Sequence, residues 1–174
     1  MNRVTLYTLL IVATAIIQAL IFDNMTLGFS LLPLVYISFI ILLPIQTSQF
    51  EMICWGTLLG VAVDFTMGTA GLNTIATLAV SYVRVYILDA YLTDDMITIG
   101  GVPTSWRIGA LRLIRYCATM QLLHSAIFFT VESMNLLAWR TTLLQFALST
   151  TVALPFIWLV AVLVGLLTYR YAER

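Results

Sequence analysis

Charged side chains are scarce in this chain: aspartate, glutamate, lysine and arginine together make up 9% of its 174 residues. A soluble domain carries about 25% charged residues, which keep its surface hydrated. Hydrophobic residues account for 61% of the chain, and its mean hydropathy is +1.03. Because too few polar side chains remain to cover a surface in water, we predict an all-α integral membrane protein.

The chain also lacks the residue sets on which most enzymes and metal sites depend. One histidine and two separated cysteines, Cys54 and Cys117, cannot supply the four ligands of a usual zinc site. The sequence has no G-x-S-x-G elbow, no H-E-x-x-H helix and no P-loop. Asp64 is alone in the apolar runs, which excludes a pair of intramembrane aspartates for proteolysis. We therefore expect a protein that is not an enzyme and has no cofactor.

Lysine is absent, and the 8 basic residues are all arginines. They form no basic cluster, so the sequence gives no indication of a surface for nucleic acid. If both termini are cytoplasmic, Arg140 alone faces the other side of the membrane, which is a clear positive-inside bias. The cytoplasmic set is Arg3, Arg84, Arg107, Arg112, Arg115, Arg170 and Arg174. We expect Arg84 to anchor its helix at the interface or to pair with Asp89.

Apolar runs between polar or Pro/Gly breaks predict a bundle of about six transmembrane helices. A span needs about 20 apolar residues, so six spans nearly exhaust the chain and 1–174 is expected to be a single membrane domain. Five spans are the main alternative, because the second and third runs are short. The connection 89–106, which carries three aspartates, is expected to be a cytoplasmic loop, either a solvated connector or a docking surface. The predicted spans are roughly 4–22, 28–45, 51–67, 71–88, 108–132 and 142–169.

A pattern of small residues around one carboxylate stands out in the stretch "GTLLGVAVDFTMGTAGLN" (56–73). Spacings of four place its members near one helix face, where paired glycines allow a second helix to approach closely. A carboxylate facing lipid would cost about 2.5–3.5 kcal/mol, so it should face protein or water. Asp64 either pins the corner between the third and fourth helices, by accepting hydrogen bonds from the turn or the next helix, or contacts a partner or substrate. The candidates for helix packing or partner contact are Gly56, Gly60, Asp64, Gly68 and Gly71.

The fifth predicted span carries a second group of polar residues. Gln121, His124 and Ser125 lie near one helix face and form a candidate intramembrane polar cluster. A proton relay from His124 to Glu132 is one hypothesis, but eight residues separate them by about 12 Å along a helix. We favour a histidine whose ring is satisfied by a neighbouring helix.

The glycine–aspartate run, followed by Tyr82 and Arg84, resembles the middle segment of the MreD family of rod-shape-determining proteins. That family has the pattern G-x3-G-x3-D-x3-G with another glycine shortly after. Its second helix opens much as Pro33 and Tyr36 do here, and Pro44 closes it. The resemblance implies a six-helix fold similar to the S component of an energy-coupling transporter.

The same resemblance implies a function and a location. The chain would be a non-catalytic component of the bacterial elongation (rod) complex in the inner membrane, with both termini cytoplasmic. Its partners would be MreC, the MreB-associated complex, the wall-synthesis transpeptidase and glycosyltransferase, and membrane lipid. The alternative is a substrate-binding S-type subunit of a vitamin transporter. The outer turns "DNMTLG", "MGTAG" and "ESMNLLAWR" offer few groups for a polar vitamin, which favours the first interpretation.

Overall fold

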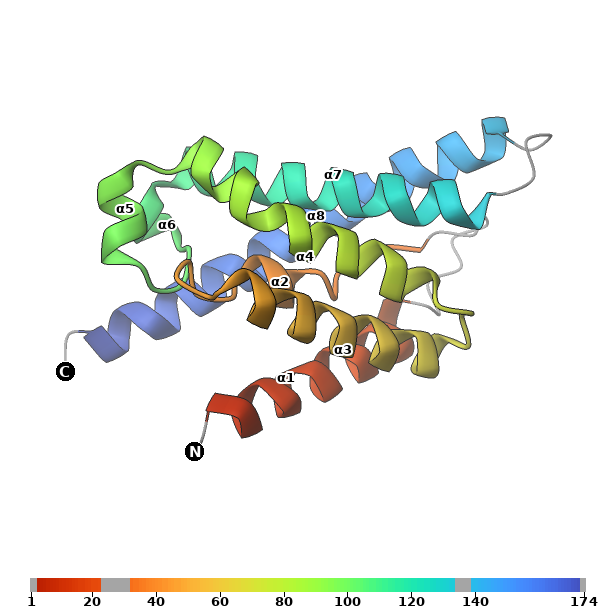
Figure 1. The fold of residues 1–174 in the computed structure, drawn as a ribbon. Coiled ribbons are helices and arrows are strands. Elements are labelled where there is room, and N and C mark those ends of the chain that lie inside the picture. Colours follow the sequence, from red (N-terminus) through yellow and green to blue (C-terminus); the bar gives the residue numbers. More distant parts are fainter. Residues whose placement is uncertain (1–2, 23–31, 134–138, 173–174) are drawn as a thin grey trace.

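The computed structural model describes residues 3–22, 32–133 and 139–172, and this part of the chain is all-α (Figure 1). The first helix, α1, continues directly into a π-helical turn, η1 (Gln18–Phe22). The α-helices of the described residues are α1 (Arg3–Ile17), α2 (Ser38–Ile41), α3 (Gln49–Met67), α4 (Leu72–Tyr91), α5 (Asp94–Ile99), α6 (Ser105–Ile108), α7 (Ala110–Glu132) and α8 (Trp139–Ala172).

The long helices pack as neighbours around the short α2. Helix α3 packs against α1 and most extensively against α4, which in turn packs against α7, and α7 packs against α8. Helix α2 contacts α1, α3, α7 and α8, and all four of its residues are buried. The start of α1 and the end of α8 lie at the same end of the bundle as α5 and α6 (Figure 1).

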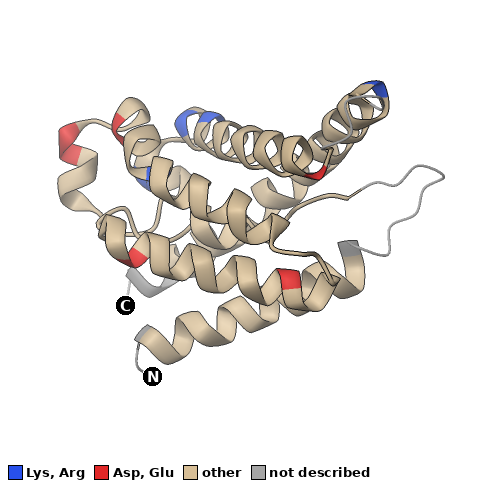
Figure 2. Cartoon of the chain, turned by 45° about the vertical axis from the view of Figure 1, so that its right-hand side comes forward, with Lys and Arg blue, Asp and Glu red and all other residues tan. Residues whose placement is uncertain are grey.

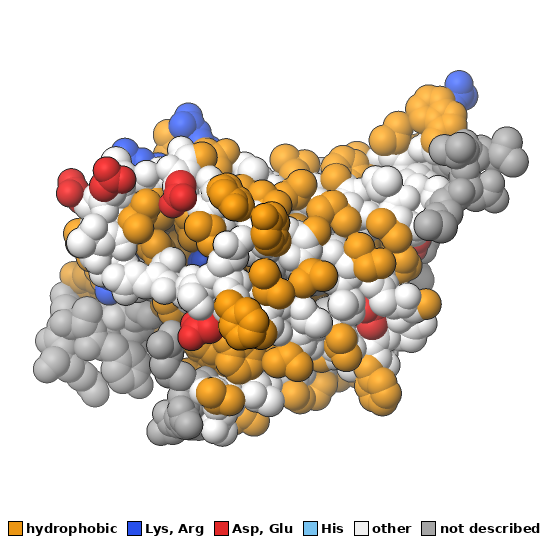
Figure 3. All heavy atoms as spheres, viewed as in Figure 1, with side chains coloured by type: hydrophobic (Ala, Val, Ile, Leu, Met, Phe, Trp, Pro, Cys, Tyr) orange, Lys and Arg blue, Asp and Glu red, His pale blue; other side chains and the backbone are white. Residues whose placement is uncertain are grey.

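Among the described residues, three helices are long and apolar enough to cross a membrane: Val4–Ile21, Gln49–Met67 and Trp139–Tyr169. Their outward faces are apolar, with Leu9 55%, Phe65 89% and Leu166 59% exposed, and hydrophobic side chains spread over the face drawn in Figure 3. Exposed apolar surface of this extent indicates a membrane location. The predicted spans 71–88 and 108–132 do form long helices, α4 and α7, but these are less apolar than the other three.

The prediction of a helical span over 28–45 is wrong in its described part, 32–45, where α2 is the only helix and has four residues. Two prolines flank the short helix: each lacks a backbone N–H and disfavours helical geometry in the residue before it. Some of the backbone groups here pair in backbone turns, and others are bound by side chains from elsewhere in the bundle. Residues 28–31 lie outside the described residues. We refer to 32–47 as the irregular segment.

The prediction of a loop over 89–106 also needs correction. Helix α4 continues to Tyr91, and the connection contains α5 and α6. Charged residues lie largely at this end of the bundle, on α5 and at the start of α7 (Figure 2). Asp94, Asp95, Arg112 and Arg115 are exposed there.

Candidate functional site

The glycines of the first pattern bring α3 against α4. A Cβ atom added to Gly60 would lie 2.5 Å from Cα of Thr74, a distance that real Cβ atoms do not show. A Cβ atom on Gly56 would lie 2.8 Å from Cβ of Ser81. Both neighbours belong to α4. The face carrying Gly56 and Gly60 therefore packs closely against α4 within the chain.

Asp64, 8% exposed, lies at the end of this face and caps the start of α4. Its Oδ1 accepts hydrogen bonds from the backbone N–H and the side-chain amide of Asn73, both at 3.0 Å, and from the hydroxyl of Thr69. Its Oδ2 accepts from the backbone N–H of Thr74 at 2.9 Å and from the Thr74 hydroxyl. Free N–H groups at a helix start favour an anion. These bonds match the expectation of a carboxylate that pins the corner between the two helices.

Two glycines supply the turn that this corner requires. Gly68 ends α3 with φ of +68°, and Gly71 precedes α4 with φ of +87°. Residues with a side chain rarely adopt a positive φ, and a glycine just after the last turn is a common way to end a helix. Gly68 and Gly71 thus shape the turn, whereas Gly56 and Gly60 allow the close approach.

A chain of buried hydrogen bonds continues from Asp64 into the bundle. The Tyr36 hydroxyl donates to Oδ1 of Asn73 at 2.8 Å and lies 2.9 Å from Nε2 of His124. Because the amide nitrogen of Asn73 donates to Asp64, its oxygen faces Tyr36 and takes the single hydroxyl proton. The Tyr36 oxygen must then accept from Nε2–H of His124, which assigns the tautomer of that ring. Asn73, Tyr36 and His124 are all 1% exposed or less.

The predicted polar cluster on α7 therefore divides in two. The side-chain amide of Gln121 donates to the hydroxyl of Ser125 at 3.0 Å, while His124 turns to Tyr36 of the irregular segment. All three side chains are buried, as an inward face requires. Among the described residues, Oε1 of Gln121 and Nδ1 of His124 have no hydrogen-bond partner.

One end of the irregular segment is held by Gln18, the first residue of the π-helical turn. Its amide nitrogen donates to the carbonyl of Pro33 at 3.0 Å, and its oxygen accepts from the backbone N–H groups of Val35 and Tyr36 at 3.0 and 3.2 Å. Gln18 is 1% exposed. Irregular backbone is tolerated at membrane depth where protein groups satisfy it, and this side chain does so.

The other end is held by Arg84, which is fully buried. Its Nη2 donates to the carbonyls of Leu43 and Ile41, and its Nε donates to the hydroxyl of Tyr116 at 2.8 Å. The Tyr116 hydroxyl donates in turn to the Ile41 carbonyl at 3.0 Å. The expectation that Arg84 anchors its helix at the interface or pairs with Asp89 is wrong, because Arg84 is buried and its partners are Ile41, Leu43 and Tyr116. The guanidinium instead binds carbonyls at the end of α2, where a cation is favoured.

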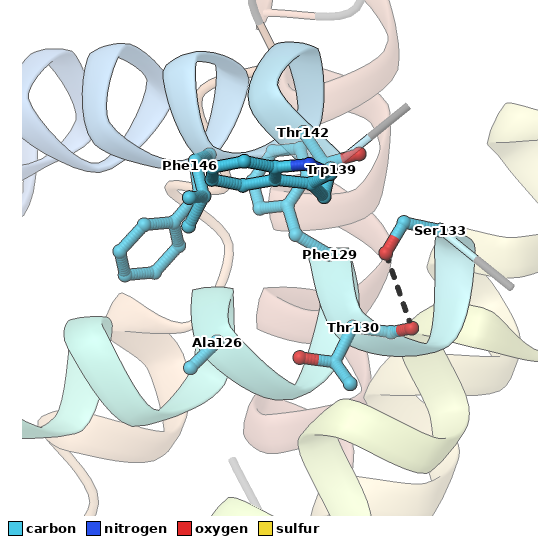
Figure 4. A pocket seen from close by; sticks show the side chains of 8 residues that line it. Ala126, Phe129, Thr130, Ser133, Trp139, Thr142 and Phe146 are labelled. Carbon is cyan, nitrogen blue, oxygen red and sulfur yellow. Dashed lines mark hydrogen bonds between the residues drawn. The ribbon is translucent and has the colours of Figure 1, made fainter. Parts of the chain in front are cut away.

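A cavity of about 230 Å³ lies apart from this network, between the end of α7 and the start of α8 (Figure 4). The aromatic rings of Phe129, Trp139 and Phe146 line it together with Thr130 and Ser133. The Ser133 hydroxyl donates to the backbone carbonyl of Thr130 at 3.4 Å.

The buried polar side chains described above hold segments of backbone and helix ends in place. Each of Gln18, Asp64 and Arg84 binds groups of the chain itself. Within the described ranges, no three His, Cys, Asp or Glu side chains come together in the manner of a metal site. Gln18 was not singled out from the sequence, although an amide inside an apolar run is itself a signal of an internal partner. From the sequence, Asn73 was expected only to belong to the turn after Asp64, and Tyr116 only to anchor its helix at the cytoplasmic side.

Comparison with models of protein families, with curated proteins and with solved structures found no match to this chain.

Proposed function

We propose that this protein is a multi-pass, non-catalytic component of a bacterial inner-membrane rod complex of the MreD type. It would bind the membrane helices of MreC and of the wall-synthesis enzymes and hold them near MreB filaments. The observation that carries the proposal is the use of the buried polar groups. Gln18, Asp64 and Arg84 form internal hydrogen bonds at the α3–α4 corner and around the irregular segment. The outer faces of the helices are apolar and would be the surfaces for partners.

The glycine–aspartate corner supports the resemblance in a specific way. In that pattern, every member has a structural use here: Gly56 and Gly60 for close approach, Asp64 for the cap, and Gly68 and Gly71 for the turn. Because each residue of the pattern has a structural role in this corner, no catalytic role is needed to account for it. This favours a scaffold over an enzyme.

The dimensions of α8 support a membrane-spanning role. At about 1.5 Å per residue, Trp139–Tyr169 covers about 46 Å, close to the thickness of a bilayer with its headgroups. Trp139, with Arg140 5.5 Å from its ring, lies at one end. Trp106 and Tyr169 lie at the other end, with their ring centroids 5.9 Å apart. The Arg107 guanidinium lies there 4.4 Å from the centroid of the Trp106 ring. Such aromatic residues are typical of membrane interfaces.

The aromatic cavity at the α7–α8 end favours the alternative, a substrate-binding S-type subunit. Aromatic rings with hydroxyl groups beside them could hold a small ligand. Its volume of about 230 Å³ is below the range of about 300–1,000 Å³ that is usual for such sites. The scaffold is therefore the function that we propose first.

Co-purification from mildly solubilised membranes tests the proposal. The chain is tagged at its C-terminus, and its partners are identified by mass spectrometry. We expect MreC and wall-synthesis enzymes. Recovery of paired ATPases and a second transmembrane subunit would reject the scaffold and support the transporter.

A further inference from the structure

A pocket of about 370 Å³ lies where the first turns of α1 and α3 meet. The described residues that line it are Val4, Tyr7, Phe50, Glu51, Cys54 and Trp55. Three of them carry aromatic rings, and only Glu51 among them is charged. Aromatic rings beside a carboxylate form sites that attract cations, because the ring faces and the carboxylate oxygens are both negative.

Two of the rings form a corner in the wall of this pocket. The rings of Tyr7 and Trp55 have centroids 5.3 Å apart and an interplanar angle of 86°. A second edge contact, with centroids 6.1 Å apart, packs Tyr7 against Phe39 of α2. Phe50, which is 76% exposed, supplies a third ring that is accessible from outside. A cation within about 6 Å of such rings is attracted to their faces.

The carboxylate of Glu51 is available to a cation. Glu51 is exposed, and within the described residues its carboxylate has no hydrogen bond and no ion pair. The start of α3 is capped through its backbone instead, since the N–H of Glu51 donates to the hydroxyl of Ser48 at 3.3 Å. A helix start carries about half a positive charge, which is less than the full negative charge of the carboxylate.

An apolar stripe on α3 leads away from the pocket. It begins at Phe50 and continues through Leu58, Val61 and Phe65, which are 54%, 52% and 89% exposed. Spacings of three, four and eight residues place them near one helix face. The stripe extends about 22 Å along the helix, most of the roughly 30 Å of a hydrocarbon core. A transmembrane helix of another protein could lie against it.

The position of the pocket selects the kind of cation. It lies at the end of the bundle that holds the start of α1 (Figure 1), which the arginine bias predicts to be cytoplasmic. Membrane proteins carry their excess of lysine and arginine on this side. A helix lying along the stripe would bring such a residue to the pocket. The amine of a zwitterionic lipid is less suitable, because its own phosphate would approach Glu51.

We propose that this pocket receives a lysine or arginine side chain from the cytoplasmic end of a partner's transmembrane helix, which lies along the apolar stripe of α3. The three rings and Glu51 account for the cation, and the stripe accounts for the helix. This inference rests on the proposed function, because it describes how the scaffold would bind one of its partner helices.

Binding of designed peptides to the full chain in phosphatidylcholine vesicles tests the proposal. Each peptide is a helix of about 20 alternating leucines and alanines, long enough to span the bilayer. It ends in one arginine or, for comparison, in one glutamine. Energy transfer from a dye on the peptide to a dye at the C-terminus of the chain reports binding. We expect the arginine peptide to bind about fivefold more tightly, as an exposed ion pair with ring contacts provides.

Variants of the pocket identify the groups responsible. Glu51→Gln should remove the preference for the arginine peptide, and Phe50→Leu should reduce it to about twofold. Glu51→Lys should reverse it in favour of a peptide that ends in glutamate. Asp89→Asn is the matched control, because it removes an exposed acidic charge at the end of α4 and outside the pocket. It should keep the wild-type preference.

Equal binding of the two peptides to the wild-type chain, or a preference that survives Glu51→Gln, overturns the proposal. A preference that is lost when phosphatidylethanolamine is added identifies a lipid amine as the occupant. A preference that appears only after Arg3→Gln identifies the chain's own arginine. Either result also overturns the proposal.

The peptide measurement uses none of the natural partners, so its result is distinguishable from that of co-purification. Recovery of MreC together with equal binding of the two peptides would reject this pocket and leave the scaffold. Recovery of paired ATPases in place of MreC would reject the scaffold, whereas the peptides alone decide the pocket.

Discussion

Arg84 of α4 and Tyr116 of α7 are joined by a hydrogen bond of 2.8 Å and both donate to one acceptor, the carbonyl of Ile41. Two helices that are neighbours in the bundle thus close the end of a third, the four-residue α2. Gln18 of η1 holds the other end of the irregular segment. The segment keeps a non-helical backbone inside the bundle because side chains from η1, α4, α7 and α8 bind its polar groups.

Replacing Arg84 by leucine should destabilise the fold strongly. The carbonyl of Leu43 would lose its side-chain donor in the interior, where an unsatisfied polar group costs about 1–3 kcal/mol, and the carbonyl of Ile41 would keep only the Tyr116 hydroxyl. We expect the free energy of unfolding in detergent micelles, followed by circular dichroism, to fall by about 2–4 kcal/mol. Arg112→Leu is the control and should change it by less than about 0.5 kcal/mol, because Arg112 is exposed. Equal effects of the two substitutions would contradict the role assigned to Arg84.

Tyr36→Phe should break the buried chain of hydrogen bonds at its centre. The substitution keeps the ring but leaves Oδ1 of Asn73 without its donor, at a cost of about 1–3 kcal/mol. Tyr86→Phe is the control, since Tyr86 is 56% exposed. A double-mutant cycle of Tyr36→Phe with His124→Leu should give a coupling energy above about 0.5 kcal/mol. Strict additivity would mean that the two side chains do not act together.

Asp64→Ala should loosen the start of α4. The alanine variant loses every acceptor that the carboxylate provides, so the backbone N–H groups of Asn73 and Thr74 lose their cap. We expect a loss of about 1–3 kcal/mol in the free energy of unfolding, with faster amide exchange at Asn73 and Thr74. Asp64→Asn should cost less, because one acceptor oxygen remains. The exposed Asp89 gives the control substitution, Asp89→Ala, and an exchange rate at Asn73 that Asp64→Ala does not change would refute the cap.

Gly60→Ala and Gly165→Ala form a matched pair that tests close packing. The new Cβ atom at Gly60 would meet the backbone of Thr74 at 2.5 Å, whereas at Gly165 the nearest atom is 3.6 Å away, on Thr104. We expect Gly60→Ala to cost about 1–3 kcal/mol of unfolding free energy, because α3 and α4 must separate. Gly165→Ala should be neutral or slightly stabilising, as alanine favours a helix. A larger loss of unfolding free energy for Gly165→Ala than for Gly60→Ala would contradict a close contact between α3 and α4 at Gly60.

The sequence by itself determined the class of protein and the course of the long helices. Low charge and a long apolar run are properties of each segment by itself, and they predict a helix in lipid without reference to the rest of the fold. The helices near 4–22, 51–67, 71–88, 108–132 and 142–169 were therefore predicted close to their observed bounds. The corner between α3 and α4 could also be predicted from the sequence. Its glycines, Asp64 and the start of α4 lie within about one helix length of each other in the chain, so spacing alone relates them.

Only the tertiary structure decided the path of 32–47 and the use of Arg84. Composition predicts that 32–47 is part of another apolar span and that Arg84 lies at the membrane interface. The donors that make the irregular backbone tolerable come from Gln18, Arg84 and Tyr116, which are far from one another in the sequence. A local pattern reports the preference of a segment, whereas a buried backbone group is satisfied by whichever side chain the fold brings to it.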